Sequence, residues 1–335
     1  MADWAELPNA VIAHIANRVK VIEDFIAFRA VCTWWRISTI KEDFDVFLPQ
    51  LPLLMLGAKD DDYREFYSLT KKKIIPIFLP QARGPHGGNR WSCIDRGVLS
   101  GNPSLTSDYV LMVHHYGPAS CLVIWRPGDL DWTHIDVVNH GGVAALIYHK
   151  GEFYSMSYCG EVRAYQVAGP NVTDQPVVQT RLLAEIDAEM YDNQLNLPDV
   201  KYYLVELSGA LLLVTRFANV TYDDPNSIFH TVKFKVSELD VIKGELKEEM
   251  KTLGYSSIFL GRNWASCIDS SKFDGIKPNH IYFTDDGLEY DRAAEGGAGK
   301  DMGAYNLEDE KFESFYPGES TSLICPPVWV MSSVM

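Results

Sequence analysis

Long apolar runs are absent from this chain of 335 residues. Its longest apolar stretches, such as residues 51–56 and 143–148, span about six residues, whereas a helix that crosses a bilayer needs about 20. The N-terminus opens with Asp3 and Glu6 and has no basic segment followed by an apolar one, so it does not resemble a secretory signal. The sequence therefore predicts a soluble protein of the cytoplasm or nucleus, with no membrane partner.

Basic side chains are also in short supply. The 30 Lys and Arg residues are outnumbered by 45 Asp and Glu residues, which gives a net charge of −15. Nucleic acids and anionic membranes are bound through basic surfaces, so we expect neither as a partner. Residues 1–50 hold five basic and seven acidic side chains, so nearly all of the excess negative charge lies in residues 51–335.

The cysteines are not spaced for a zinc site or a disulfide framework. The six residues are Cys32, Cys93, Cys121, Cys159, Cys267 and Cys325. No pair has C-x-x-C spacing, and a chain without a secretory signal is expected to keep its thiols reduced. His134, Asp136 and His140 could cluster, but ordinary strand and loop positions explain them as well. We therefore expect no metal site.

Catalytic motifs are missing as well. The sequence contains no Gly-x-Ser-x-Gly, no phosphate-binding Gly-x-x-x-x-Gly-Lys-Ser/Thr and no Gly-x-Gly-x-x-Gly. Adjacent acids such as Asp223-Asp224 and Asp285-Asp286 could act as the paired carboxylates of a sugar-active propeller enzyme, but acids in loops are usually solvated charge. The sequence therefore predicts a protein that is not an enzyme and needs no cofactor, with a propeller enzyme as a less favoured alternative.

The chain changes character near residue 50. Before that point apolar residues recur at the spacing of one helix face, in two sets: Ile12, Ile15, Ala16 and Val19, then Phe28, Val31, Cys32 and Trp35. We predict a helical domain at residues 1–50. A unit of this size cannot bury so many large apolar side chains, so they form either an interface for a partner or a helical cap packed on the rest of the chain.

From Leu51 onward the apolar residues follow the period of two that is typical of strands. Short runs rich in β-branched and aromatic residues alternate with turn clusters, and hairpins are recognisable at residues 148–154 and 157–162. The roughly 285 residues of short strands exceed a sandwich, whereas propeller blades of four strands take about 40–50 residues each. We therefore predict a mainly β protein with a β-propeller at residues 51–335. About 22 strands favour six blades, with seven as the alternative.

The N-terminal domain contains a recognisable series of motifs. Leu7-Pro8 is followed by the apolar positions Ile12 and Ile15, by Asp24, and by Phe-Arg-Ala-Val-Cys-Thr-Trp-Trp-Arg over residues 28–36. This order and spacing resembles an F-box. The rest of the chain resembles the KIB-type β-propeller of plant F-box proteins. The matching segments are residues 64–69, 125–132, 148–154, 258–261, 281–286 and 326–329.

The resemblance implies a substrate-recognition subunit of an SCF-type (Skp–cullin–F-box) E3 ubiquitin ligase. The F-box would dock a Skp-family adaptor, which leads to a cullin–RING ligase, and the propeller would bind an unidentified target protein for ubiquitination. The adaptor-binding residues would be Leu7, Pro8, Ile12, Ile15, Phe28, Val31, Cys32, Trp35 and Arg36. Trp35 and Arg36 are of the residue types that dominate interfaces. The alternative is a β-propeller interaction scaffold without a ligase role.

Four residues are candidates for binding the target: Trp91, Trp264, Asp285 and Asp286. The two tryptophans lie next to the two copies of a Ser-Cys-Ile-Asp repeat, and they could line a binding face or pack between blades. Residues 285–313 carry ten acidic side chains against three basic ones, so we expect a long acidic loop that could recruit a basic target.

Overall fold

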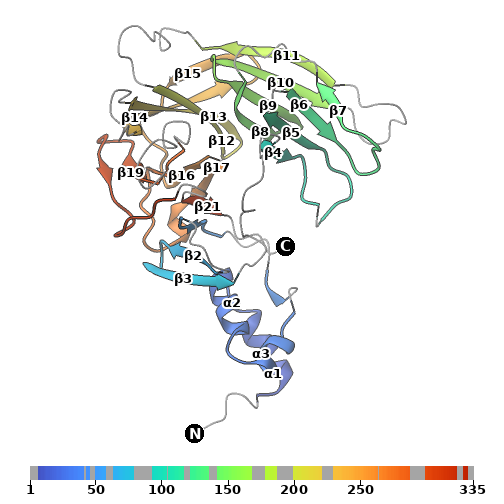
Figure 1. The fold of residues 1–335 in the computed structure, drawn as a ribbon, viewed down its shortest axis with the longest axis vertical. Helices are drawn as coiled ribbons and strands as arrows, with labels where there is room; N and C mark the ends of the chain where they lie inside the picture. Colours follow the sequence, from blue (N-terminus) through green and yellow to red (C-terminus); the bar gives the residue numbers. More distant parts are fainter. Residues whose placement is uncertain are drawn as a thin grey trace. The chain divides into compact units, whose positions relative to one another are not determined.

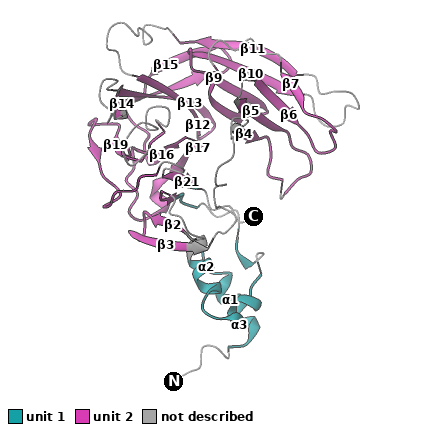
Figure 2. Ribbon diagram, in the orientation of Figure 1, with its two compact units in different colours: residues 1–53, 330–335 teal, residues 54–329 magenta. Residues whose placement is uncertain are grey.

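The computed structural model describes residues 7–40, 43–45, 50–57, 63–78, 93–103, 105–116, 121–135, 142–167, 178–186, 199–220, 229–262, 264–286, 299–322 and 327–330. The chain divides into two compact units (Figure 2). The helical unit comprises residues 1–53 with 330–335, and the strand-rich unit comprises residues 54–329. No helix in these ranges is long and apolar enough to span a bilayer.

The helical unit contains α1 (Asn9–Ala16), α2 (Ile22–Arg29) and α3 (Thr33–Ile37) (Figure 1). Pro8 precedes α1, where the absence of its N–H costs nothing, and its carbonyl accepts hydrogen bonds from the Val11 and Ile12 amides. Ala16, Phe25 and Phe44 form a small core, with the two phenyl rings 5.2 Å apart. Each fully buried side chain of this kind stabilises the fold by about 1.5–3 kcal/mol.

The second predicted helix is in fact two helices. Cys32 adopts an extended backbone with φ −160°, and its Sγ accepts a hydrogen bond from the Trp35 amide at 3.5 Å, so it caps a new helix. Because the helix restarts here, the spacing from Phe28 to Trp35 does not follow one continuous helix face. Trp35 instead packs against Phe28, with ring centroids 4.5 Å apart.

The described strands form five sheets, which we number as blades 1 to 5 in chain order (Figure 1). Blade 1 consists of β21 (Val328–Val330), β1 (Leu53–Met55), β2 (Tyr63–Ser68) and β3 (Lys73–Phe78). Blade 2 consists of β4 (Cys93–Leu99), β5 (Leu111–Tyr116), β6 (Cys121–Trp125) and β7 (Thr133–Ile135). Blade 3 consists of β8 (Val143–His149), β9 (Glu152–Ser157), β10 (Glu161–Val167) and β11 (Val178–Glu185).

Blades 4 and 5 use longer or additional strands. Blade 4 consists of β12 (Asp199–Leu207), β13 (Ala210–Val220), β14 (Phe229–Asp240) and β15 (Glu245–Glu249). Blade 5 has the order β17 (Trp264–Asp269), β16 (Ser256–Gly261), β18 (His280–Phe283), β19 (Gly303–Asn306) and β20 (Phe312–Glu313), with the short helix η5 (Ser270–Lys272) after β17. Its β16 and β18 run parallel, whereas the other strand pairs with a described register are antiparallel.

The expectation of six or seven blades is not supported, because these strands group into five sheets. Residues 54–329 provide about 55 residues per blade, more than the 40–50 assumed for common propeller repeats. The described residues contain 21 strands, close to the predicted 22, but blade 5 holds five of them. The count of strands was therefore nearly right, and the assumption of four strands in every blade was wrong.

Both predicted hairpins are present in blade 3. The β8–β9 pair has His149 opposite Glu152, and the turn between them has positive φ at Lys150 (46°) and Gly151 (92°). Such angles belong to a two-residue hairpin turn that matches the twist of the strands. Gly160, with φ 91°, lies in the β9–β10 connection. Strand β11 ends at Glu185, and residues 187–198 lie outside the described residues.

Apolar side chains from neighbouring blades interlock into separate cores. One core joins blades 2 and 3, a second joins blades 3 and 4, and a third joins blades 4 and 5. In the third, Val214 and Phe234 of blade 4 meet Ile258 and Phe283 of blade 5, and each side chain is at most 2% exposed. Face-to-face packing of radially arranged sheets is how a propeller buries its apolar residues.

Blade 1 combines strands from both ends of the strand-rich unit, because β21 lies next to β1. Trp329 of β21 also attaches this blade to blade 5. Its indole Nε1–H donates to the Leu260 carbonyl at 3.1 Å, and its ring packs edge-on against Phe259 at 5.0 Å. The C-terminal Trp motif of the sequence thus serves as an anchor between the first and last blades.

Candidate functional site

The first candidate site is an apolar surface on the helical unit. The Trp34 indole Nε1–H donates to the Leu7 carbonyl at 3.1 Å, and the Ser38 hydroxyl donates to Asn9 Oδ1 at 2.8 Å. These bonds hold the Leu7-Pro8 segment beside α3. Leu7 is half-buried and Pro8 is exposed at this position.

Large apolar side chains are exposed around this contact. Val31 is 60%, Trp34 45% and Ile37 68% exposed, and the three are spaced three residues apart. We call Leu7, Pro8, Val31, Trp34 and Ile37 the helical surface. Seven of the twenty exposed large apolar residues in the described chain lie between residues 11 and 40. Exposed apolar side chains at this density mark an interaction surface rather than ordinary scatter.

The structure revises the predicted adaptor-binding set. Ile12 (0% exposed) and Trp35 (9%) are buried, so neither can contact a partner while the helices are folded. Pro8, Val31 and Arg36 are exposed, whereas Leu7, Ile15, Phe28 and Cys32 are half-buried. Trp34, which is not in the predicted set, is exposed because a new helix begins after Cys32.

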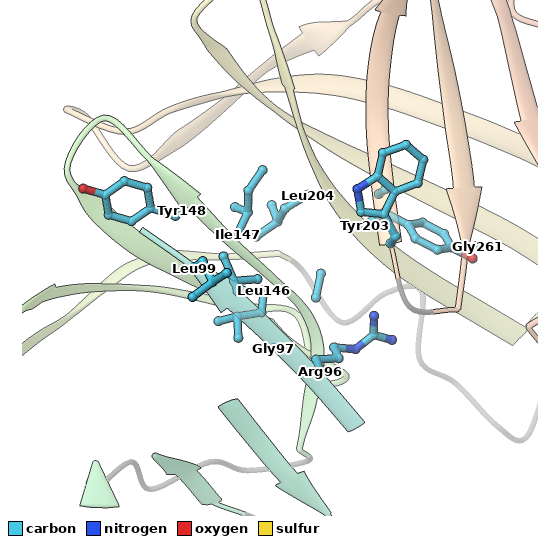
Figure 3. A pocket seen from close by; sticks show the side chains of 13 residues that line it. Arg96, Gly97, Leu99, Leu146, Ile147, Tyr148, Tyr203, Leu204 and Gly261 are labelled. Carbon is cyan, nitrogen blue, oxygen red and sulfur yellow. The ribbon is translucent and has the colours of Figure 1, made fainter. Parts of the chain in front are cut away.

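The second candidate site is a cavity of about 210 Å³ between the inner strands of the propeller. Its walls come from β4, β8, β12 and β17, each of which is the edge strand of its own sheet, together with Gly261 at the end of β16. In Figure 3, Tyr148 and Arg96 lie at opposite ends of a row of aliphatic side chains that includes Leu99 and Leu146. The Arg96 Nη1–H donates to the Arg262 carbonyl at 2.9 Å and so links β4 to the β16–β17 turn.

Trp264 is the one predicted target-binding residue that the structure places at this cavity, where it is half-buried. Trp91 lies outside the described residues. Both copies of the Ser-Cys-Ile-Asp repeat run into strands that line the cavity, β4 and β17. The described lining is mainly apolar and aromatic, with Arg96 as its only charged residue. The cavity can therefore offer contact area and one cationic hydrogen-bond donor.

Asp285 and Asp286 do not belong to a binding face. Asp285 is 2% exposed, and its carboxylate accepts hydrogen bonds from the amides of Gly299 (2.8 Å) and Lys300 (3.0 Å). The Asp286 side chain is 6% exposed and pairs with Lys201 at 3.1 Å and with Arg216 at 3.0 Å. The expectation that these acids are solvated is wrong: Asp286 joins blade 5 to blade 4, and Asp285 fixes the segment that precedes β19.

Arg216 is the centre of this buried network and was not identified from the sequence. Its side chain is fully buried. Its Nε–H donates to Thr231 Oγ1 (2.7 Å), one terminal nitrogen donates to Asp286 and to the Thr284 carbonyl (2.9 Å), and the other donates to Asp301 (2.7 Å). A buried charge is tolerated when its partners are this complete. No local motif marks the network, because its members lie on β12, β13, β14 and the segments that follow β18 and precede β19.

Charge pairing outweighs burial in this network. Burial opposes ionisation of Arg216, but Asp286 and the neighbouring acids raise the pKa of the guanidinium. Burial likewise opposes ionisation of Asp286, yet Lys201 and Arg216 lower the pKa of its carboxyl to about 2. Burial and the Asp286 charge raise the pKa of the Tyr203 hydroxyl, which donates a hydrogen bond to Asp286.

Part of the predicted acidic loop is ordered structure. Residues 299–313 contain β19 and β20, and Asp301 is buried in the Arg216 network. Residues 287–298 lie outside the described part of the chain. Within the described ranges there is no group of three or more His, Cys, Asp or Glu that could hold a metal ion. Asp136 and His140 of the considered histidine cluster are not among the described residues.

The sequence was also compared with known proteins. Residues 42–306 match the family model described as the KIB1-4 beta-propeller. No curated protein matches the sequence.

Three solved structures match part of this chain. BBS1N in complex with ARL6DN is 14% identical over 59% of this chain, with a TM-score of 0.25, and this chain covers 61% of it, less than two thirds. An exo-1,5-α-L-arabinanase from a bovine ruminal metagenomic library is 12% identical over 58% of this chain and 74% of its own, with a TM-score of 0.28. YCF48 bound to D1 peptide is 8% identical over 59% of this chain and 68% of its own, with a TM-score of 0.23. Scores of this size support no conclusion about function.

Proposed function

The chain belongs to the KIB1-4 β-propeller family, and we propose that it is the substrate-recognition subunit of an SCF-type E3 ubiquitin ligase in the cytoplasm or nucleus. The fold of this family suggests protein interaction. In the proposal the helical unit is an F-box that docks a Skp-family adaptor, and the propeller holds the target protein. The protein itself performs no covalent chemistry. It raises the effective concentration of the target next to the ubiquitin-conjugating enzyme.

The observation that carries the proposal is the helical surface. Its Leu7-Pro8 and α3 parts are the two motifs of the F-box resemblance, and hydrogen bonds between them hold both in one place. Val31, Trp34 and Ile37 would otherwise expose apolar area to water at a cost of about 25 cal/mol per Å². An adaptor with an apolar groove would cover them. A propeller scaffold without a ligase role would have no need for this surface.

Binding to a purified Skp-family adaptor tests the proposal, measured by isothermal titration calorimetry with the full chain. We expect the wild type to bind and the double variant V31S/I37S to bind at least about tenfold more weakly. The matched control is I242S, which removes an equally apolar side chain, 92% exposed, from blade 4. Absence of wild-type binding, or equal affinity of V31S/I37S and I242S, would contradict the adaptor role.

A further inference from the structure

Two loops of blade 2 emerge at the same end of its strands. The register places Leu99 opposite Leu111, Leu111 opposite Trp125, and Ile124 opposite Thr133. The β4–β5 loop (residues 100–110) and the β6–β7 loop (residues 126–132) therefore leave the blade side by side. Tyr109 and Trp125 at their bases are in ring contact, with centroids 6.4 Å apart.

The β6–β7 loop is locked by one pair of residues. The Asp129 carboxylate accepts hydrogen bonds from the Arg126 amide (2.9 Å) and from its guanidinium (3.1 Å), while the Asp129 carbonyl accepts from the Trp125 indole (3.1 Å). Arg126 is only 5% exposed. Gly128 supplies the positive φ of 99° that the turn requires. The loop is therefore a fixed turn rather than a free segment.

This fixed turn presents apolar side chains to solvent. Leu130 is 98% and Trp132 44% exposed, and the adjacent loop adds Leu105 at 58%. Leu99 is 39% exposed at the end of β4 and also lines the cavity between the inner strands. Because the backbone of this turn is already fixed, binding here costs little backbone conformational entropy, and a central aromatic or aliphatic anchor dominates interface energies.

The exposed charged side chains of these two loops are negative. Asp108 and Asp131 are exposed, and neither forms an ion pair with another described residue. Arg126 is the only Lys or Arg between residues 99 and 135, and it is buried against Asp129. A second copy of the chain would bring identical acids together, and an anionic lipid surface would be repelled. The surface fits a partner with positive charge beside apolar side chains.

We propose that Leu99, Leu105, Asp108, Leu130, Asp131 and Trp132 form the blade 2 loop surface, which docks a segment of the target protein that carries large apolar side chains next to Lys or Arg. The inference rests on the proposed function in one respect: it takes the bound protein to be the target for ubiquitination. Leu130 and Trp132 are the anchors. Asp108 and Asp131 steer the basic groups and raise the association rate.

A phage-displayed library of random peptides tests this surface on the full chain, with counter-selection on the variant L130S/W132S. Peptides that survive should carry Lys or Arg beside large apolar residues. Measured by fluorescence anisotropy, they should bind L130S/W132S at least about tenfold more weakly than the wild type. The control I242S should bind them as the wild type does. The variant D108N/D131N should show slower association and a weaker salt dependence, with little change in dissociation.

The inference is overturned if no peptide survives counter-selection, if survivors are acidic, or if I242S weakens binding as much as L130S/W132S. It is also overturned if analytical ultracentrifugation shows that the wild type self-associates through this surface and L130S/W132S does not. Both loop variants should bind the Skp-family adaptor normally. If the wild type does not bind the adaptor, the proposed ligase role is contradicted but the peptide result still stands. Failure of the proposed function and failure of the docking inference are therefore distinguishable.

Discussion

Nη1 of Arg216 lies 3.0 Å from Oδ1 of Asp286, and the two side chains are 0% and 6% exposed. Arg216 belongs to β13 of blade 4, and Asp286 follows β18 of blade 5. The ion pair therefore bridges two blades, beside the apolar core between them and together with the Lys201–Asp286 and Arg216–Asp301 pairs. This buried ion pair links blades 4 and 5 at a position where the sequence predicted a solvated acid.

Replacing Arg216 with Ala should lower the free energy of unfolding by about 3–5 kcal/mol, because Asp286 and Asp301 would be left buried without their partner. Urea denaturation of the full chain measures the change. The matched control is K247A, which removes a cation paired with Glu238 but 52% exposed. That substitution should change the free energy of unfolding far less, because solvent screens an exposed ion pair. Equal losses for the two variants would show that the buried pair is not structural.

Acid should destabilise the wild type partly through Asp286. Burial alone would raise its pKa, but Lys201 and Arg216 lower it from 3.8 to about 2 in the folded protein. A carboxyl whose pKa is depressed by folding stabilises the fold fully above pH 4 and loses this contribution as the pH falls toward 2. Between those values the stability of the wild type should fall about 2 kcal/mol further than that of D286N. Parallel pH profiles would exclude this role.

Substitutions of Trp34 and Trp35 should have different effects, one on adaptor binding and the other on stability. W34A should reduce adaptor affinity at least about tenfold and should cost less stability than W35A, because Trp34 is 45% exposed whereas Trp35 is 9% exposed. W35A should destabilise the helical unit by about 3–5 kcal/mol, because the ring packs on Phe28. Hydrogen–deuterium exchange of the α2 and α3 amides reports the stability. If W35A weakened adaptor binding with exchange unchanged, Trp35 would be the contact residue.

Gly244 and Gly151 offer a matched pair of glycine substitutions. Both have positive φ, 73° and 92°, so alanine strains the backbone at either site by about 1–2 kcal/mol. At Gly244 a Cβ would also come within 2.1 Å of the Leu183 carbonyl oxygen, whereas at Gly151 nothing lies within 4 Å. G244A should therefore cost about 1–3 kcal/mol more than G151A in thermal unfolding. Equal costs would mean that β11 and the β14–β15 turn separate easily.

Local patterns predicted the strands but could not predict how they group. Alternating apolar residues and the Lys150-Gly151 turn determine the β8–β9 hairpin within a few residues. The grouping depends on pairings between distant segments, such as β21 beside β1 and β16 parallel to β18. A total of about 22 strands can be divided into five sheets if one sheet has an additional strand, or into six sheets if some have fewer than four. No local signal in the sequence distinguishes these arrangements.

The site was predicted less completely than the fold. The Leu7-Pro8 and Val31 positions of the helical surface came from the sequence, but the cap at Cys32 moved the exposed tryptophan from Trp35 to Trp34. Asp286 looked solvated because its cation, Arg216, is 70 residues away in the chain. Whether an acidic side chain is buried in an ion pair cannot be predicted locally when its partner is distant in the sequence.

The position of β21 also has a consequence during synthesis. Strand β1 is complete about 275 residues before its neighbour β21 has been made, which at roughly 5–20 residues per second is a wait on the order of tens of seconds. Throughout this interval the backbone groups along one side of β1 remain an open edge, the kind of edge that pairs with other chains. The nascent propeller therefore carries one unpaired strand edge until β21, with Trp329, reaches β1.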